Sequence, residues 1–226
     1  MNKITLAHSP DPDDAFMWWP LADIDGSGPS MDVGEWEFEL VMKDIESLNI
    51  EAEKAIHDIT AISIAQYPRV AQAYDLTACG ASLGDGYGPK LVAKEQCSID
   101  ELFANAPRIA VPGDRTTALA TLRILAGDRK FKWESIDFTT IMDQVHEGQY
   151  DAGVVIHEGQ LSFEENGLFE ICDFGKWWQE RTGLLLPLGG NAIRKDFDKR
   201  YGAGATKEIT ALLKKSIEYA MANREK

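Results

Sequence analysis

The sequence predicts a two-lobed α/β fold in which the chain crosses twice between the lobes. Strand-like and helix-like segments alternate along most of the 226 residues, as they do in a mainly parallel sheet covered by helices. Glycine-rich segments interrupt this alternation at 80–89 and again at 183–193, and such segments are typical of connections. We therefore expect one lobe from 1–89 together with 189–226, and a second lobe from 90–188.

Each element follows from its pattern of apolar residues. Strands appear as short alternating or continuous apolar runs, and helices as apolar residues three and four apart behind a polar cap. Predicted strands lie at 3–8, 35–41, 57–62, 90–94, 137–140, 151–156 and 168–172, with one more beginning at Arg108. Predicted helices begin near Ala15, Ile45, Ile64, Ser98 and Thr117, and further helices cover 141–147 and 206–226. The last helix has no Gly or Pro stop, so we expect the lobe to continue in a longer natural chain.

Composition and charge exclude several classes of partner. Hydrophobic residues make up 44% of the chain, enough for a real core. The formal net charge is −14, from 37 acidic and 23 basic residues, which argues against nucleic acid and against an anionic membrane surface. It does not exclude a small anionic metabolite, because backbone N–H groups at helix N-termini bind carboxylates whatever the global charge.

The compartment predicted from the sequence is the cytoplasm. The chain opens directly on a strand pattern without a signal peptide, and no apolar run approaches the ~18 residues of a spanning helix. The three cysteines, Cys79, Cys97 and Cys172, form no CxxC pair, so neither a disulfide framework nor a zinc site is expected. The oligomeric state stays open.

Hydroxyl side chains stand where predicted strands give way to helices. Ser63, Thr116 and Thr117 occupy such junctions, where unpaired N–H groups of a helix start point the same way. One interpretation is plain N-capping, and the other is a cradle for a ligand carboxylate. Three such junctions in one cleft would form the cradle, and both interpretations stay open.

The acidic loop after the first strand has two interpretations. Its carboxylates, Asp11, Asp13 and Asp14, could form half of a divalent-metal site. Alternatively, Asp13 or Asp14 caps the helix beginning near Ala15. No HExxH motif, cysteine pair or complete calcium loop accompanies the run, so no metal site is expected. Ser9 and Asp11 leave the strand at its carboxyl end and are candidates for ligand contact.

The tetrapeptide His-Glu-Gly-Gln occurs twice, at 146–149 and 157–160. His146 falls in the last turn of a predicted helix that Gly148 stops, where an imidazole suits the helix dipole. His157 instead follows a buried strand directly, which is a position typical of ligand chemistry. His157 is therefore the candidate catalytic residue, although a structural role remains the alternative. The aromatic pair Trp177 and Trp178 is either packing or a wall for a planar ligand.

Five segments, in order along nearly the whole chain, resemble the 1,4-dihydroxy-6-naphthoate synthase family of the futalosine route to menaquinone. They are Ser9–Phe16, Ala61–Ser63, Gly86–Pro89, Pro112–Ala118 and Asp151–Gln160. The resemblance implies a periplasmic-binding-protein-like (type II) fold. It also implies a lyase that converts cyclic dehypoxanthine futalosine to 1,4-dihydroxy-6-naphthoate in a cleft between two lobes, with no organic cofactor or metal.

The resemblance also implies roles for individual residues. It places the catalytic base on His157, and ligand contacts on Asn49, Ser63, Thr117 and the backbone N–H of Ala118. Neutral His157 would abstract a proton, and a fragmentation that aromatises the naphthoate ring would follow, with cleft closure excluding water. The family commonly has Cys and Asn where Asp11 and Asp13 stand here, so this first loop is more anionic than the resemblance implies.

Two other functions fit the same pattern. Chorismate dehydratase of the same pathway would also bind a carboxylate, but the segment 156–160 and the Ser-Pro loop favour the synthase. A solute-binding protein for a small carboxylate needs no base, and the missing signal sequence argues against it. A relative that has kept the fold and lost the reaction is a third alternative.

Overall fold

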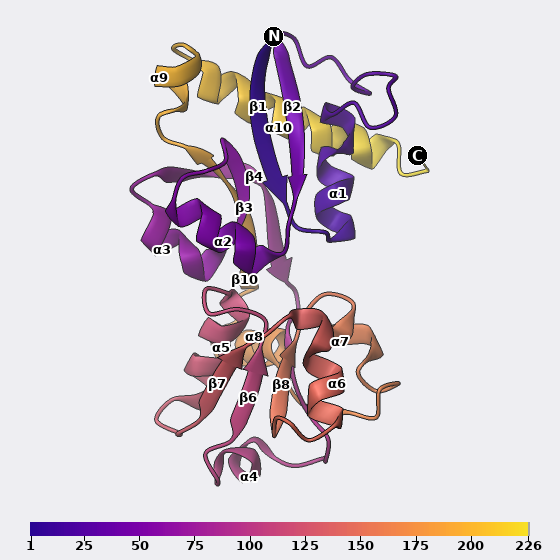
Figure 1. Cartoon of the computed structure of the whole chain (residues 1–226), viewed down its shortest axis with the longest axis vertical. Coiled ribbons are helices and arrows are strands. Elements are labelled where there is room, and N and C mark those ends of the chain that lie inside the picture. Colours follow the sequence, from indigo (N-terminus) through magenta and orange to yellow (C-terminus); the bar gives the residue numbers. More distant parts are fainter. Residues whose placement is uncertain (226) are drawn as a thin grey trace. The chain divides into compact units, whose positions relative to one another are not determined.

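A computed structural model describes residues 1–225 and divides them into two compact units (Figure 1). Unit 1 contains Met1–Ser82 and the segment from Gly189 onward, and unit 2 contains Leu83–Leu188. Two strands, β4 (Tyr74–Gly84) and β10 (Leu186–Arg194), carry the chain from one unit into the other. Each unit has its own sheet of five strands.

Unit 1 is built on a mixed sheet of order β2-β1-β3-β10-β4. β1 (Asn2–His8) pairs in parallel with β2 (Trp36–Met42) and with β3 (Ile59–Ser63), and β10 runs antiparallel to β3. All five residues of β3 are buried, as expected of a central strand covered on both faces. The helices are α1 (Pro12–Trp18), α2 (Ile45–Glu53), α3 (Tyr67–Val70), α9 (Phe197–Tyr201) and α10 (Ala205–Ala222), with 3-10 turns η1 (Trp19–Leu21) and η2 (Ile64–Gln66).

The C-terminal helix α10 completes the core of unit 1. Its Ile209 and Leu213 are fully buried in one cluster with Ile4, Leu6 and Trp18. Figure 1 shows α10 running past β1 and β2 beside α1, which it contacts. The amphipathic spacing of its apolar residues explains this packing.

Unit 2 is built on a sheet of order β7-β6-β8-β5-β9. β6 (Arg108–Val111), β7 (Lys132–Ser135) and β8 (Ala152–Val155) are parallel, whereas β5 (Lys90–Ala93) is antiparallel to β8 and to β9 (Phe169–Asp173). The helices are α4 (Ile99–Phe103), α5 (Thr117–Ala126), α6 (Ile141–His146), α7 (Gly159–Ser162) and α8 (Phe174–Thr182), with the 3-10 turn η3 (Phe138–Thr140). The core combines β5, β6 and β8 with Leu119 and Leu122 of α5.

The predicted strand at 137–140 is wrong. Phe138–Thr140 is a 3-10 turn, begun by Asp137, whose carboxylate accepts the Thr139 N–H at 2.9 Å. The strand of this region is β7, which lies earlier, at the sheet edge. All four of its residues are exposed, so it carries no apolar pattern that could have predicted it.

Helix α8 was not predicted, although both of its ends carry ordinary signals. The Asp173 carboxylate accepts the N–H groups of Gly175 (2.9 Å) and Lys176 (3.1 Å). Gly183 ends the helix in the left-handed conformation, with φ 71°. Trp177 and Trp178 lie on this helix and pack against the core of unit 2.

Residues 1–225 contain neither a candidate membrane span nor a candidate metal cluster. No helix there is long and apolar enough to cross a bilayer. No group of three His, Cys, Asp or Glu side chains in that range could hold a metal ion.

Candidate functional site

The predicted site residues collect at one sheet edge in each unit. In unit 1 the parallel strands β1 and β3 end at His8 and Ser63, and in unit 2 the parallel strands β6 and β8 end at Val111 and Val155. We refer to these as the unit 1 edge and the unit 2 edge. Because parallel strands bring their carboxyl ends to the same side of a sheet, residues that follow them in sequence become neighbours.

Asn49 fixes the orientation of Ser63 at the unit 1 edge. Both side chains are buried. Asn49 Nδ2 donates to Ser63 Oγ at 3.0 Å, and Ser63 N–H donates to Asn49 Oδ1 at 2.9 Å. These two bonds hold the Ser63 side chain at the end of β3. Asn49 acts here through Ser63.

The first loop is fixed by Asp14. Ser9 donates both its N–H and its hydroxyl to Asp14 Oδ2, each at 2.8 Å, and Ser9 Oγ accepts the Asp11 N–H at 3.3 Å. Burial raises the pKa of the Asp14 carboxyl from its ordinary 3.8, against the hydrogen bonds from Ser9. The hydroxyl of Ser9 is therefore used inside the loop.

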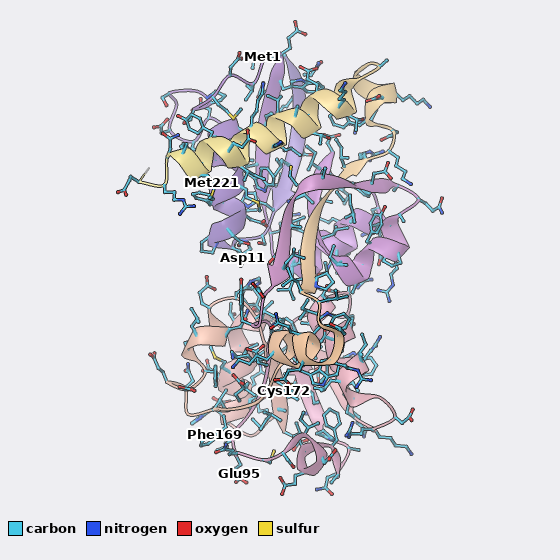
Figure 2. The ribbon with its side chains drawn as sticks, turned by 180° about the vertical axis from the view of Figure 1, so that it is seen from behind. Met1, Asp11, Glu95, Phe169, Cys172 and Met221 are labelled. Carbon is cyan, nitrogen blue, oxygen red and sulfur yellow. The ribbon has the colours of Figure 1, made fainter. Side chains whose placement is uncertain are left out.

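The expectation that Asp13 or Asp14 caps the following helix is wrong. Helix α1 begins at Pro12 with Asp11 in the N-cap position, and no side chain caps it. Pro12 accounts for the earlier start, because proline fits the first turn, where no N–H partner exists anyway. Asp11 is half-buried, and Figure 2 shows it on the loop that follows β1.

At the unit 2 edge, helix α5 begins immediately after the loop that follows β6. Thr116 caps it, donating its hydroxyl to the Gly113 carbonyl (2.9 Å) and accepting the Leu119 N–H (3.2 Å). The Thr117 hydroxyl donates to the Leu188 carbonyl at 2.7 Å. The Ala118 N–H has no acceptor within residues 1–225. The hydroxyl protons of Thr116 and Thr117 are therefore used within the protein, so the predicted cradle depends on the backbone N–H groups of this helix start and stays a prediction.

His157 follows β8 at the same unit 2 edge, two residues beyond the end of the strand. Its backbone is left-handed, with φ 53°, a conformation that costs a residue with a side chain on the order of 1 kcal/mol. Its ring meets the Phe138 ring edge to face, with centroids 5.1 Å apart, and Nε2 is shielded from solvent. Backbone strain and a packed ring fix this imidazole at the strand end.

Gln160 connects His157 to a glycine segment far away in sequence. Oriented by its hydrogen-bond partners, the Gln160 amide donates to the Gly88 carbonyl at 2.6 Å and accepts the His157 N–H at 3.1 Å. Gly88 in turn lies against Gly175, where a Cβ on Gly88 would come within 2.9 Å of the Gly175 nitrogen. Gly86–Pro89 and Asp151–Gln160, two of the five segments that carry the family resemblance, are thus joined next to His157.

The sequence patterns did not identify His8, Asp14 or Gln160 as parts of these edges. His8 ends a strand and could have been found by its position, whereas Asp14 and Gln160 are recognisable only from their contacts. His146, in contrast, ends α6 as predicted and is exposed, with Gly148 at φ 78° after it. Glu158 is exposed as well.

Comparisons with known proteins agree on one family. A family model described as menaquinone biosynthesis matches residues 4–226. A 1,4-dihydroxy-6-naphthoate synthase of Thermus thermophilus is 33% identical over 225 residues, which cover 100% of this chain and 77% of that protein. The resemblance found in the sequence is confirmed.

Solved structures confirm the fold. A crystal structure of a protein from Archaeoglobus fulgidus matches with a TM-score of 0.85 and 39% identity, covering 98% of this chain and 78% of that one. The alkanesulfonate-binding protein of Xanthomonas axonopodis pv. citri matches with a TM-score of 0.65 and 12% identity, covering 96% and 73%. The predicted two-lobed α/β fold of the periplasmic-binding-protein type is therefore confirmed.

Proposed function

The chain belongs to the menaquinone-biosynthesis family that includes 1,4-dihydroxy-6-naphthoate synthase, and from this we propose that it is itself such a synthase. It is a lyase that takes cyclic dehypoxanthine futalosine and releases 1,4-dihydroxy-6-naphthoate. The observation that carries the proposal at the residue level is the fixed imidazole of His157 just beyond the carboxyl end of β8.

The start of helix α5 binds the ligand carboxylate in this proposal. The Ala118 N–H and the positive end of the helix dipole favour an anion, and no charged side chain is needed for it. Thr116 and Thr117 hold the helix start in place through their bonds to Gly113 and Leu188. This explains how a chain of net charge −14 can act on a carboxylate.

His157 is the general base. A neutral imidazole accepts a proton from the ligand, and fragmentation then aromatises the naphthoate ring. Shielding of Nε2 from solvent keeps water away from this part of the ring. At the unit 1 edge, Ser63, held by Asn49, and the first loop with Ser9 and Asp11 are the candidates for ligand contact within that unit.

The test compares the two His-Glu-Gly-Gln segments directly. The parent, His157→Asn and His146→Asn are incubated with cyclic dehypoxanthine futalosine, and 1,4-dihydroxy-6-naphthoate is measured by chromatography. Asn tolerates the left-handed backbone of His157 better than Ala does, so His157→Asn keeps the fold. We expect kcat to fall by about 10²- to 10⁴-fold in His157→Asn and to stay unchanged in His146→Asn.

Each result has a definite meaning. No product from the folded parent overturns the synthase, and chorismate is then offered as substrate to test for dehydration, with calorimetry to test for binding alone. Equal product from the parent and His157→Asn keeps the enzyme and removes His157 as the base.

A further inference from the structure

Unit 2 contains a cavity that the proposed mechanism does not use. It lies among the helices α4, α5 and α8 (Figure 1) and has a volume of about 370 Å³. Pockets for small ligands measure about 300 to 1,000 Å³, so the cavity has room for a small molecule. Its walls include Ile99, Ile124, Leu125, Arg129, Trp177 and Arg181.

The cavity lies at the far end of α5 from the proposed carboxylate cradle. Leu125 belongs to the last turn of this helix and Gly127 follows it, whereas the N–H groups of the cradle belong to the first turn, which begins at Thr117. At 1.5 Å per residue, the ten residues of α5 span about 15 Å. A ligand in the cavity is therefore separate from one at the start of α5.

Apolar side chains give the cavity a surface that suits a ring. Ile99 and Trp177 are half-buried and pack against the core of unit 2, which fixes them in place. Ile124, in contrast, is 54% exposed. A ligand ring seated against these side chains would remove apolar surface from water, and an indole also stacks on other aromatic rings.

Arg181 is a cation of this cavity that makes no ion pair within residues 1–225. Its guanidinium carbon lies 5.8 Å from the centre of the Trp177 ring, a cation–π contact that keeps it beside the apolar wall. The Arg129 guanidinium, by contrast, bonds to Asp100 Oδ1 through Nε (3.1 Å) and Nη2 (2.6 Å). Arg129 thus offsets the charge of Asp100, and Arg181 remains to bind an anion.

Arg129 also offsets the negative end of α5. Its Nη1 donates to the carbonyls of Leu125 (3.5 Å) and Ala126 (3.3 Å) in the last turn of the helix. Helix C-termini otherwise disfavour anions, because their last carbonyls carry partial negative charge. The cavity therefore combines an apolar wall with one cation that is not already paired.

We propose that this cavity binds a small aromatic carboxylate, with its ring against Trp177 and Ile124 and its carboxylate on Arg181. A guanidinium binds a carboxylate through two parallel N–H bonds and also stacks on aromatic faces. Arg181 beside Trp177 suits both parts of such a ligand. The site goes beyond the proposed function and requires neither His157 nor the start of α5.

The test follows the indole N–H resonance of Trp177 in protein labelled with ¹⁵N-tryptophan, assigned by its loss in Trp177→Phe. 2-Naphthoate is the probe. 2-Naphthamide has the same ring without the charge, and acetate has the charge without the ring. We expect 2-naphthoate to shift the Trp177 resonance to saturation, 2-naphthamide to bind about tenfold more weakly, and acetate to leave the resonance in place.

Arg181→Gln and Arg123→Gln form a matched pair of variants. Arg123 also lies over a tryptophan of unit 2, at 4.4 Å from the centre of the Trp133 ring, but it does not line the cavity. We expect Arg181→Gln to raise the Kd of 2-naphthoate by about tenfold and Arg123→Gln to leave it unchanged. Both arginines are exposed, so both variants should keep the parent melting temperature.

The site is overturned if 2-naphthoate does not move the Trp177 resonance, if 2-naphthamide binds equally well, or if folded Arg181→Gln keeps the parent affinity. Sedimentation tests the other occupant of this face. A parent that dimerises and becomes monomeric in Ile124→Asp would show that a second copy covers the cavity, which also overturns the proposal. None of these results depends on turnover, so they are distinguishable from a failure of the proposed function.

Discussion

At the residue scale, the structure distinguishes hydroxyl groups that sequence patterns treat alike. Thr116, Thr117 and Ser9 use their protons within the protein, on Gly113, Leu188 and Asp14. Ser63 instead accepts a hydrogen bond from Asn49. The side chains could be assigned to strand ends because strand and helix signals are local, but the partner of each proton depends on the folded geometry, as when Thr117 bonds to Leu188, 71 residues away.

Asp14 gives a pH-dependent prediction. Its pKa is raised mainly by burial, with Asp13 and Asp11 adding to the effect. The folded protein therefore binds a proton at a pH where the unfolded chain has lost it, and stability falls as pH rises from below 3.8 through the raised folded pKa. Asp14→Asn cannot titrate, and its amide oxygen can still accept from Ser9.

We expect the free energy of unfolding of the parent, relative to Asp14→Asn, to decrease across that pH window and then level off. Urea unfolding at a series of pH values measures it, and circular dichroism checks the fold at each pH. A difference between the two proteins that stays constant with pH would contradict the role assigned to burial.

At the element scale, the parts predicted correctly are those with a strong local pattern. The strands β1, β6 and β8 and the helix α10 have clear apolar periodicity, and the structure contains each of them. The edge strand β7 is exposed throughout, and helix α8 has few buried residues. Neither has an apolar face wide enough to predict, so their form follows from tertiary contacts.

The close approach of α8 to the 84–88 segment gives a prediction at this scale. A Cβ on Gly175 would overlap the Tyr87 carbonyl, which is backbone and cannot rotate away. Gly183 ends the same helix at φ 71° with nothing within 4 Å of a Cβ. We expect Gly175→Ala to cost about 3 kcal/mol of unfolding free energy, and Gly183→Ala only about 1 kcal/mol.

Chemical denaturation of both variants measures these values. Because Gln160 bonds to Gly88, Gly175→Ala should also lower turnover through the position of His157. Equal losses of unfolding free energy in the two variants would mean that the close packing of Gly175 against the 84–88 segment does not restrict the side chain at position 175.

At the scale of the whole molecule, each unit has apolar clusters of its own, of which two are compared. One contains Leu213 of α10 with Ile4 and Leu6 of β1, and the other contains Leu122 of α5 with Ile109 of β6. Unit 1 is assembled from both ends of the chain, so its core depends on a contact between residues about 200 positions apart. Sequence periodicity indicated α10, but not which strands it covers.

Two matched substitutions test whether the units lose stability separately. Leu213 and Leu122 are both fully buried, so each change to Ala leaves a cavity and costs about 2–5 kcal/mol. We expect Leu213→Ala to weaken amide hydrogen-exchange protection in β1 and β3 while β6 and β8 keep theirs, and Leu122→Ala to do the reverse. Loss of protection in all four strands from either substitution would show one cooperative unit instead, because a cavity in one core would then open the whole chain.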